Sequence, residues 1–358
     1  MLFNLWARSS YFLNDFSLYL ILISLSLLIT VVAVILIFKS NLKIIRKKIL
    51  ISAALTILTL ILTYSLFEAY FRYVYDASDG LGFLKINERW HNRHVVYNSD
   101  FFRDRNFDVN KKPGVARIGV LGDSITFGGG IENVNDRFSN ILEKKLRAAN
   151  FSVEVYNLGK PGYDTEGEIQ VYDSVKHLNF DIIIWQYFLN DIQALGKSTG
   201  TPIIVKNSKT GKTVQFLSEK SFFFDFLYWR TSSKYNKTLG ELRNADLERY
   251  KDADQLKTHQ DQITSFLKDL KSENKKVVVI IFPFLYFLGP NYPAQDVHQI
   301  MSKHFSENGA QVIDLLDYLK GYTGRDLWAS RFDSHPNEYV HQVTAQKLYE
   351  RLIDLIKQ

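Results

Sequence analysis

The sequence predicts an α/β domain with a parallel sheet of about five strands, preceded by two transmembrane helices. Two observations carry this prediction. Two long runs without a charged residue lie near the N-terminus, at residues 16–38 and 49–67. From Val115 onward, short apolar segments alternate with helical patterns, as expected where helices cover both faces of a parallel sheet.

Each of the two apolar runs is long enough to cross a bilayer, which requires about 20 residues of helix. A pair of buried core helices is the alternative, but buried helices of this length rarely lack charge entirely. A cleaved signal peptide fits poorly, because the first run is too long and no small-residue cleavage site follows it. Residues 1–75 are therefore interpreted as a membrane anchor.

The loop between the two runs is basic and predicts the topology. It contains Lys39, Lys43, Arg46, Lys47 and Lys48. The positive-inside rule places this loop in the cytoplasm, so the large C-terminal domain is expected to be periplasmic or extracellular. The net charge of +6 owes much to this cluster and does not indicate nucleic-acid binding. The absence of cysteine excludes disulfides and thiolate chemistry.

Residues 76–114 are expected to form an ordered connector, since they contain too many aromatic side chains for a disordered linker. The main domain is assigned to residues 115–358. Its strands are predicted at residues 117–121, 153–156, 181–185, 277–281 and 311–314, with amphipathic helices at 137–149 and 337–356.

A long insertion, residues 193–275, separates the third and fourth predicted strands. Its second half predicts one charged helix over 239–270, and residues 203–216 suggest a β-hairpin. The aromatic segment 221–229 has two interpretations. It packs as core beneath the insertion, or it contacts the membrane or an acyl pocket.

The first strand leads into Gly122-Asp123-Ser124, at the edge where open α/β sheets bind ligands. Alone, this triplet also fits a phosphate-binding loop or an ordinary turn. Pro336 disfavours helical geometry at His335, which keeps this imidazole ahead of the last helix, at the same edge of the sheet. A serine nucleophile needs such a base and an orienting carboxylate. Asp333 is the near candidate and Asp326 a weaker one.

These motifs resemble the SGNH (GDSL-like) hydrolase family, from about Val115 to the C-terminus. The first family block matches Gly122-Asp123-Ser124, and the second matches Asn157 to Thr165, with Gly162 or alternatively Gly159 as an oxyanion donor. The third block, usually Gly-x-Asn-Asp, is Phe188-Leu189-Asn190-Asp191 here. The last, usually Asp-x-x-His, is shortened to Asp333-Ser334-His335.

The resemblance implies a flavodoxin-like, three-layer sandwich and an esterase mechanism. Ser124 would be the nucleophile, His335 its base and Asp333 the orienting acid. The amides of Ser124 and Gly162 and the side chain of Asn190 would form the oxyanion hole. No cofactor or metal is implied, and His91 and His94 lack a companion acidic motif.

The resulting hypothesis is a membrane-anchored, extracytoplasmic serine esterase. Its expected substrate is an acylated glycan or lipid-like ester, with removal of O-acetyl groups from a cell-surface polysaccharide as the leading reaction. One alternative is an O-acyltransferase with the same triad, although two spans without intramembrane charge offer no path for an acyl donor. The other is a non-catalytic, membrane-tethered binding module, which the complete set of site residues disfavours. No protein partner is predicted.

Overall fold

The computed structural model describes residues 2–192 and 211–357, with side chains described from residue 20 onward. The chain divides into two compact units. The first combines Met1–Tyr75 with Gln215–Leu227, and the second combines Asp76–Val214 with Tyr228–Gln358. The long insertion therefore contributes to both units.

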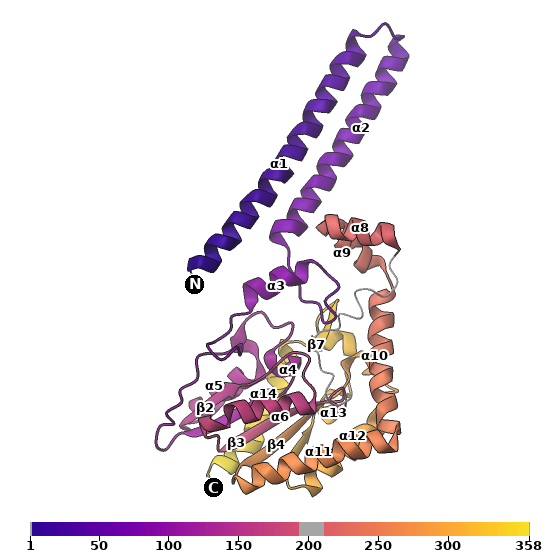
Figure 1. Ribbon diagram of the computed structural model, residues 1–358. Coiled ribbons are helices and arrows are strands. Elements are labelled where there is room, and N and C mark those ends of the chain that lie inside the picture. Colours follow the sequence, from indigo (N-terminus) through magenta and orange to yellow (C-terminus); the bar gives the residue numbers. More distant parts are fainter. Residues whose placement is uncertain (1, 193–210, 358) are drawn as a thin grey trace. The chain divides into compact units, whose positions relative to one another are not determined.

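The first unit is built on two long helices, α1 (Leu2–Lys39) and α2 (Ile44–Ala69), which lie side by side in Figure 1. A π-helical turn, η1 (Tyr70–Val74), continues α2. Among the described residues, Leu20–Lys39 and Ile44–Val74 are long and apolar enough to cross a membrane, and neither span is buried within the protein. Both predicted apolar runs are thus helical, and they form two candidate membrane helices.

The insertion adds α8 (Lys212–Lys220) and α9 (Phe222–Thr231). The predicted β-hairpin is wrong in its second arm, because Val214 and Phe216 lie in helix α8. Val214 and Ser218 are the half-buried positions of α8, and their spacing of one turn suits a helix rather than a strand. The first arm of that hairpin lies outside the described residues.

A buried carboxylate of α2 caps helix α9 within the first unit. Glu68 accepts hydrogen bonds from the Ser221 hydroxyl at 2.7 Å and from the amides of Phe222 and Phe223 at 3.0 Å each. Arg72 pairs with the same carboxylate at 2.8 Å. The first amides of a helix have no partner within the helix, so Glu68 satisfies groups that α9 alone would leave unpaired.

The aromatic segment also packs on the end of α2. Phe223 stacks on Phe67 with ring centroids 4.9 Å apart, and Phe226 stacks on Phe71 at 4.3 Å. These two phenylalanines thus pack against the candidate membrane helix. Neither interpretation of segment 221–229, as core beneath the insertion or as a contact with the membrane or an acyl pocket, describes this packing completely.

The second unit contains a five-stranded parallel sheet within the described residues, in the order β2-β1-β3-β4-β5. This confirms the predicted α/β fold class. The strands are β1 (Ala116–Leu121), β2 (Val153–Asn157), β3 (Ile182–Phe188), β4 (Lys276–Phe282) and β5 (Gln311–Asp314). Every side chain of β3 is buried, as expected for a strand covered on both faces.

Helices flank this sheet in two layers (Figure 1). Helix α5 (Phe138–Ala148) packs with α14 (Glu338–Lys357), while α11 (Ala253–Ser272) packs with α6 (Thr165–Val175) and α12 (Gln295–Glu307). The remaining elements are α3 (Ile86–His94), α4 (Ser124–Phe127), α10 (Lys234–Lys251), α13 (Leu316–Leu319), η2 (Val134–Asp136), η3 (Lys176–Leu178), η4 (Leu285–Phe287) and η5 (Gly324–Leu327). A small antiparallel pair joins β6 (Trp328–Ser330) to β7 (Asp333–Pro336).

The single charged helix predicted over 239–270 is wrong, because two helices, α10 and α11, occupy that range. They are separated at Asp252, whose extended backbone interrupts the helix. The Asp252 side chain accepts hydrogen bonds from the amides of Asp254 and Gln255, at 3.1 and 3.0 Å. Aspartate favours this N-cap geometry over a helix interior, and this preference explains the break.

Candidate active site

Ser124 begins the short helix α4, directly after strand β1. Asp123 caps this helix by accepting a hydrogen bond from the Ile125 amide at 2.8 Å. Gly122 has a φ of +156°, and a Cβ there would lie 2.2 Å from the Thr126 hydroxyl. Only glycine fits at this turn, which presents the Ser124 hydroxyl at the carboxyl end of the sheet.

The structure brings Ser124, His335 and Asp333 into one hydrogen-bonded chain. His335 Nε2 lies 2.7 Å from Ser124 Oγ. The other ring nitrogen, Nδ1, is hydrogen-bonded to Asp333 Oδ1, which also accepts from the His335 amide at 3.0 Å. His335 lies in strand β7, ahead of α14. Asp326 lies in η5, where its carbonyl accepts from Asn337, so Asp333 is the acid that contacts the histidine.

Electrostatic interactions among Ser124, His335 and Asp333 favour an ionised carboxylate beside the histidine. Burial alone would lower the pKa of His335, but the Asp333 charge and hydrogen bond outweigh burial and raise it. Burial would raise the pKa of Asp333, whereas His335 and the Ser78 hydroxyl lower it below its ordinary value. Asp333 is therefore suited to hold the ring so that Nε2 faces the serine.

Two residues that support Asp333 were not predicted from the sequence. Ser78 is buried, and its side chain hydrogen-bonds to Asp333. The Gly80 amide donates to the Phe332 carbonyl at 3.0 Å, and a Cβ at Gly80 would lie 3.0 Å from Asp333 Oδ1. The only local signal was the Asp79-Gly80 pair, which is typical of any turn and does not indicate a site.

The three candidate oxyanion donors follow neighbouring strands of the sheet. Ser124 follows β1, Gly162 follows β2, and Asn190 follows β3, so the order β2-β1-β3 places their loops at one edge of the sheet. The Gly159 amide donates to Asn157 Oδ1 at 3.1 Å. A Cβ at Gly159 would lie 2.2 Å from the Phe127 amide nitrogen. Gly159 thus permits close packing against α4, which leaves Gly162 as the better candidate donor.

A buried arginine from the connector supports the glycine-rich loop that follows Ser124. Arg103 donates hydrogen bonds to the carbonyls of Gly128 and Ile131, at 2.7 Å each, and to that of His94 at 2.8 Å. Its burial lowers the pKa of the guanidinium to about 10. Because two buried carbonyls of the loop share this one cation, Arg103 holds the loop in a fixed conformation.

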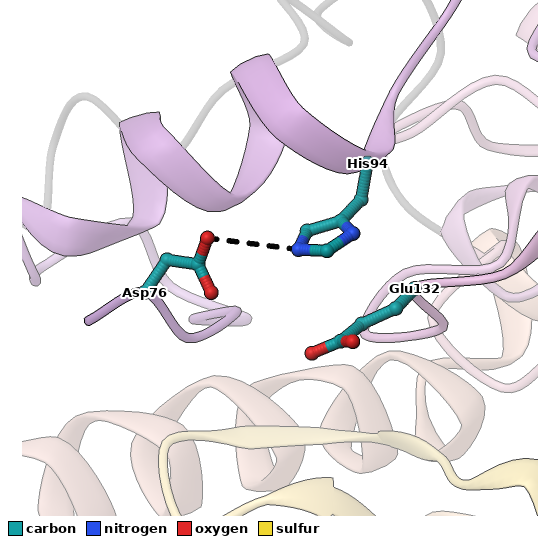
Figure 2. A group of neighbouring side chains, drawn as sticks. All are labelled: Asp76, His94 and Glu132. Carbon is teal, nitrogen blue, oxygen red and sulfur yellow. Dashed lines mark ion pairs between the residues drawn. The ribbon is translucent and has the colours of Figure 1, made fainter. Parts of the chain in front are cut away.

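Asp76, His94 and Glu132 form a separate group of potential metal ligands, with atoms within 4.8 Å of one another (Figure 2). Asp76 Oδ2 already accepts a hydrogen bond from Arg93 at 2.8 Å and lies 3.6 Å from His94 Nε2. Glu132 is exposed. Asp76 is thus engaged by Arg93 and His94, and no metal is assigned to the group.

Comparison with known families identifies the second unit. Residues 120–343 match the GDSL-like lipase/acylhydrolase family. The chain belongs to this family. This GDSL-like acylhydrolase is a serine hydrolase that acts on ester bonds.

Solved structures similar to this GDSL-like acylhydrolase share low sequence identity with it. TesA is 13% identical, with a TM-score of 0.41 over 66% of this chain and 98% of that chain. The esterase EstA from Pseudoalteromonas sp. is 13% identical, with a TM-score of 0.39 over 68% and 99%. The acetyl xylan esterase AlAXEase is 15% identical, with a TM-score of 0.39 over 66% and 99%. No curated protein matches the sequence significantly.

Proposed function

We propose that this GDSL-like acylhydrolase is a membrane-anchored, extracytoplasmic esterase that removes O-acetyl groups from a cell-surface glycan. The observation that carries ester hydrolysis is the continuous chain from Ser124 Oγ through His335 to Asp333, with 2.7 Å between the hydroxyl and His335 Nε2. A hydroxyl becomes an effective nucleophile when a positioned base accepts its proton.

In the proposed mechanism, Ser124 Oγ attacks the ester carbonyl while His335 Nε2 takes the hydroxyl proton. Asp333 holds the ring and stabilises the imidazolium that forms. The amides of Ser124 and Gly162 and the Asn190 side chain stabilise the oxyanion, and each such donor typically contributes about 3 kcal/mol. The imidazolium protonates the departing alcohol. His335 then activates water, which releases the acetyl group as acetate and restores the serine.

The proposed external location and the proposed glycan substrate are both inferred from the membrane anchor. Two candidate membrane helices flank a basic loop, residues 39–48, which favours a cytoplasmic loop and an external catalytic unit. An external esterase tethered to the membrane has access to acylated polymers at the cell surface. A coenzyme-bound acyl donor would be confined to the cytoplasm, which favours hydrolysis over transfer.

The test uses the full chain in detergent with 4-nitrophenyl acetate and an O-acetylated polysaccharide. Ser124→Ala should lower turnover of both by at least about 1,000-fold, because the nucleophile is lost. A fluorophosphonate probe should label Ser124 alone. Ser306→Ala, at an exposed serine of α12, is the control. Full activity in the Ser124 variant, or labelling at another serine, would contradict the proposal.

Hydrolysis and transfer are separated by their products. An activated acetyl ester is supplied together with an unacetylated polysaccharide, and both acetate and acetylated polymer are followed. Acetate release that does not depend on the polymer supports the esterase. Acetylated polymer formed at the expense of acetate would identify a transferase.

A further inference from the structure

Arg243 lies at the carboxyl edge of the sheet, on helix α10 of the insertion. Its guanidinium stacks over the rings of Phe188 and Phe284, with 4.9 Å to each ring centroid. Phe188 ends strand β3, two residues before Asn190, and Phe284 follows strand β4 by two residues. The insertion thus brings a cation to the strand end that carries a candidate oxyanion donor. Stacking on two aromatic rings restricts the orientation of the planar guanidinium.

The charge of Arg243 is only partly neutralised by its neighbours. Arg243 Nη1 lies 3.3 Å from Asp246 Oδ2, a long contact, and Arg249 Nη1 is hydrogen-bonded to the other oxygen of that carboxylate. Two guanidinium groups therefore share one buried carboxylate, which leaves one positive charge in excess. Asp246 is 3% exposed, so its negative charge is fixed in place between them.

Arg243 also retains hydrogen-bond donors. Across residues 2–192 and 211–357, Nε and Nη2 of Arg243 have no hydrogen-bond acceptor, and neither is among the buried unpartnered atoms. The Arg243 side chain is 17% exposed. These two nitrogens form one edge of the guanidinium fork, the edge that pairs with two oxygens of a carboxylate or phosphate.

The guanidinium is close enough to the reacting groups to act on them electrostatically. Burial and Asp333 have the larger effects on the pKa of His335, and the Arg243 charge adds a lowering effect. Burial raises the pKa of Asp123, next to the candidate nucleophile, and the Arg243 charge again acts in the lowering direction. Arg243 therefore lies at the same edge of the sheet as Ser124 and within electrostatic range of the reacting groups.

We propose that Arg243 forms an anion-binding subsite beside the ester site, which binds a carboxylate or phosphate substituent of the acylated sugar. The proposal rests on the proposed function and narrows its substrate class to acidic glycans. A purely structural role, in which the stacked side chain only ties α10 to the sheet, is the competing explanation.

The first experiment compares matched esters on the full chain in detergent. The substrates are the O-acetylated methyl glycosides of glucuronate, glucose 6-phosphate and glucose, and the readout is the ratio of kcat/KM for each acidic ester to that for the neutral one. Arg243→Gln should lower the ratio for the preferred acidic ester by about 10- to 100-fold, mainly through KM, because a charge-assisted fork is lost. Arg243→Lys, which keeps the charge without the fork, should give an intermediate ratio.

Lys237→Gln is the matched control, since Lys237 is an exposed cation on the same helix that pairs with Glu241 and not with Asp246, and it should keep the wild-type ratio. Preference for the glucuronate ester identifies a uronic acid, and preference for the phosphate ester identifies a phosphorylated sugar. A wild-type ratio near one would overturn the subsite. If the Arg243→Gln variant keeps the wild-type ratio, but hydrolyses acidic and neutral esters equally slowly and melts at a lower temperature, Arg243 has a structural role instead.

A binding measurement separates failure of the subsite from failure of the proposed function. Ser124→Ala protein, which needs no turnover, is titrated with methyl glucuronide, methyl glucoside 6-phosphate and methyl glucoside by calorimetry. Binding of an anionic sugar that is lost in the Ser124→Ala, Arg243→Gln double variant supports the subsite even if no ester is hydrolysed. Equal affinity for the three sugars would contradict it even if esterase activity is present.

Discussion

At the scale of single residues, the site depends on groups that lie far from one another in the sequence. Asp333 contacts His335 on one side and the Ser78 hydroxyl on the other. The missing side chain of Gly80 leaves space for this carboxylate, since a Cβ would lie 3.0 Å from its oxygen. The connector before the sheet therefore helps to position the acid, and it does so with small residues.

The dependence of activity on pH should report the pairing of His335 with Asp333. Only the neutral imidazole accepts the serine proton, so kcat/KM should rise as pH increases through the pKa of His335. Because Asp333 raises this pKa, the midpoint of the acid limb should lie above about 6.5, the ordinary value for histidine. The measurement is a pH profile of 4-nitrophenyl acetate hydrolysis.

Asp333→Asn provides the comparison for that profile. Removing the carboxylate charge should move the midpoint to lower pH and reduce kcat by about 1,000- to 10,000-fold, since the ring loses its orienting partner. Asp326→Asn, at the acid that does not contact His335, should leave the midpoint in place. An upward shift in the Asp333 variant would contradict the assignment of this pair.

At the scale of elements, helix α9 depends on a residue of another helix for its N-terminal cap. Glu68 supplies the acceptor for the amides of Phe222 and Phe223 from within α2. The aromatic stacks of Phe223 and Phe226 then bury the same face of α9 against Phe67 and Phe71. Cap and stacking act on one helix, so loss of the cap should loosen the segment locally.

Glu68→Ala should therefore destabilise α9 by about 1–2 kcal/mol, in the range measured for lost N-caps. Amide hydrogen exchange at Phe222 and Phe223 should accelerate by about 5- to 30-fold in the detergent-solubilised chain. Glu219→Ala, at an exposed carboxylate of α8, should not change exchange at these amides. Unchanged protection in the Glu68 variant would show that stacking alone holds α9.

At the scale of the whole molecule, the chain combines a helical unit that exposes apolar side chains with an α/β unit that carries the ester site. The insertion after β3 contributes most of α8 and the first part of α9 to the helical unit, and α10 with Arg243 to the α/β unit. One segment thus supplies both a packing partner for the second candidate membrane helix and a cation for the proposed subsite.

The proposed topology predicts which parts of the chain face the outside. In cells whose outer envelope has been made permeable, the basic loop, residues 39–48, should resist added protease while the catalytic unit should be cleaved, because basic loops are retained in the cytoplasm. A reporter that is active only in the cytoplasm should stay inactive when fused after Gln358. Reporter activity there would mean that the orientation is reversed.

The sequence by itself determined the features that depend on local pattern. Each of the five strands contains a short apolar segment, nearly continuous in β3 and β4, so its position was predictable to within a few residues. Ser124, His335 and Asp333 were predicted as site residues because they sit in short motifs at the ends of such elements. The two apolar helices were equally clear, since length and lack of charge are properties of one segment.

Tertiary structure alone decided which distant groups meet. Ser78 and Gly80 resemble any polar turn, and Arg243 resembles any cation on the exposed face of a charged helix. Their importance comes from neighbours more than 40 residues away, in β7 and at the ends of β3 and β4. The break at Asp252 and the helical state of α8 were missed for a different reason, because local propensity allows more than one state at both places. The N-cap preference of aspartate selects the break, and α8 places its half-buried residues one helical turn apart.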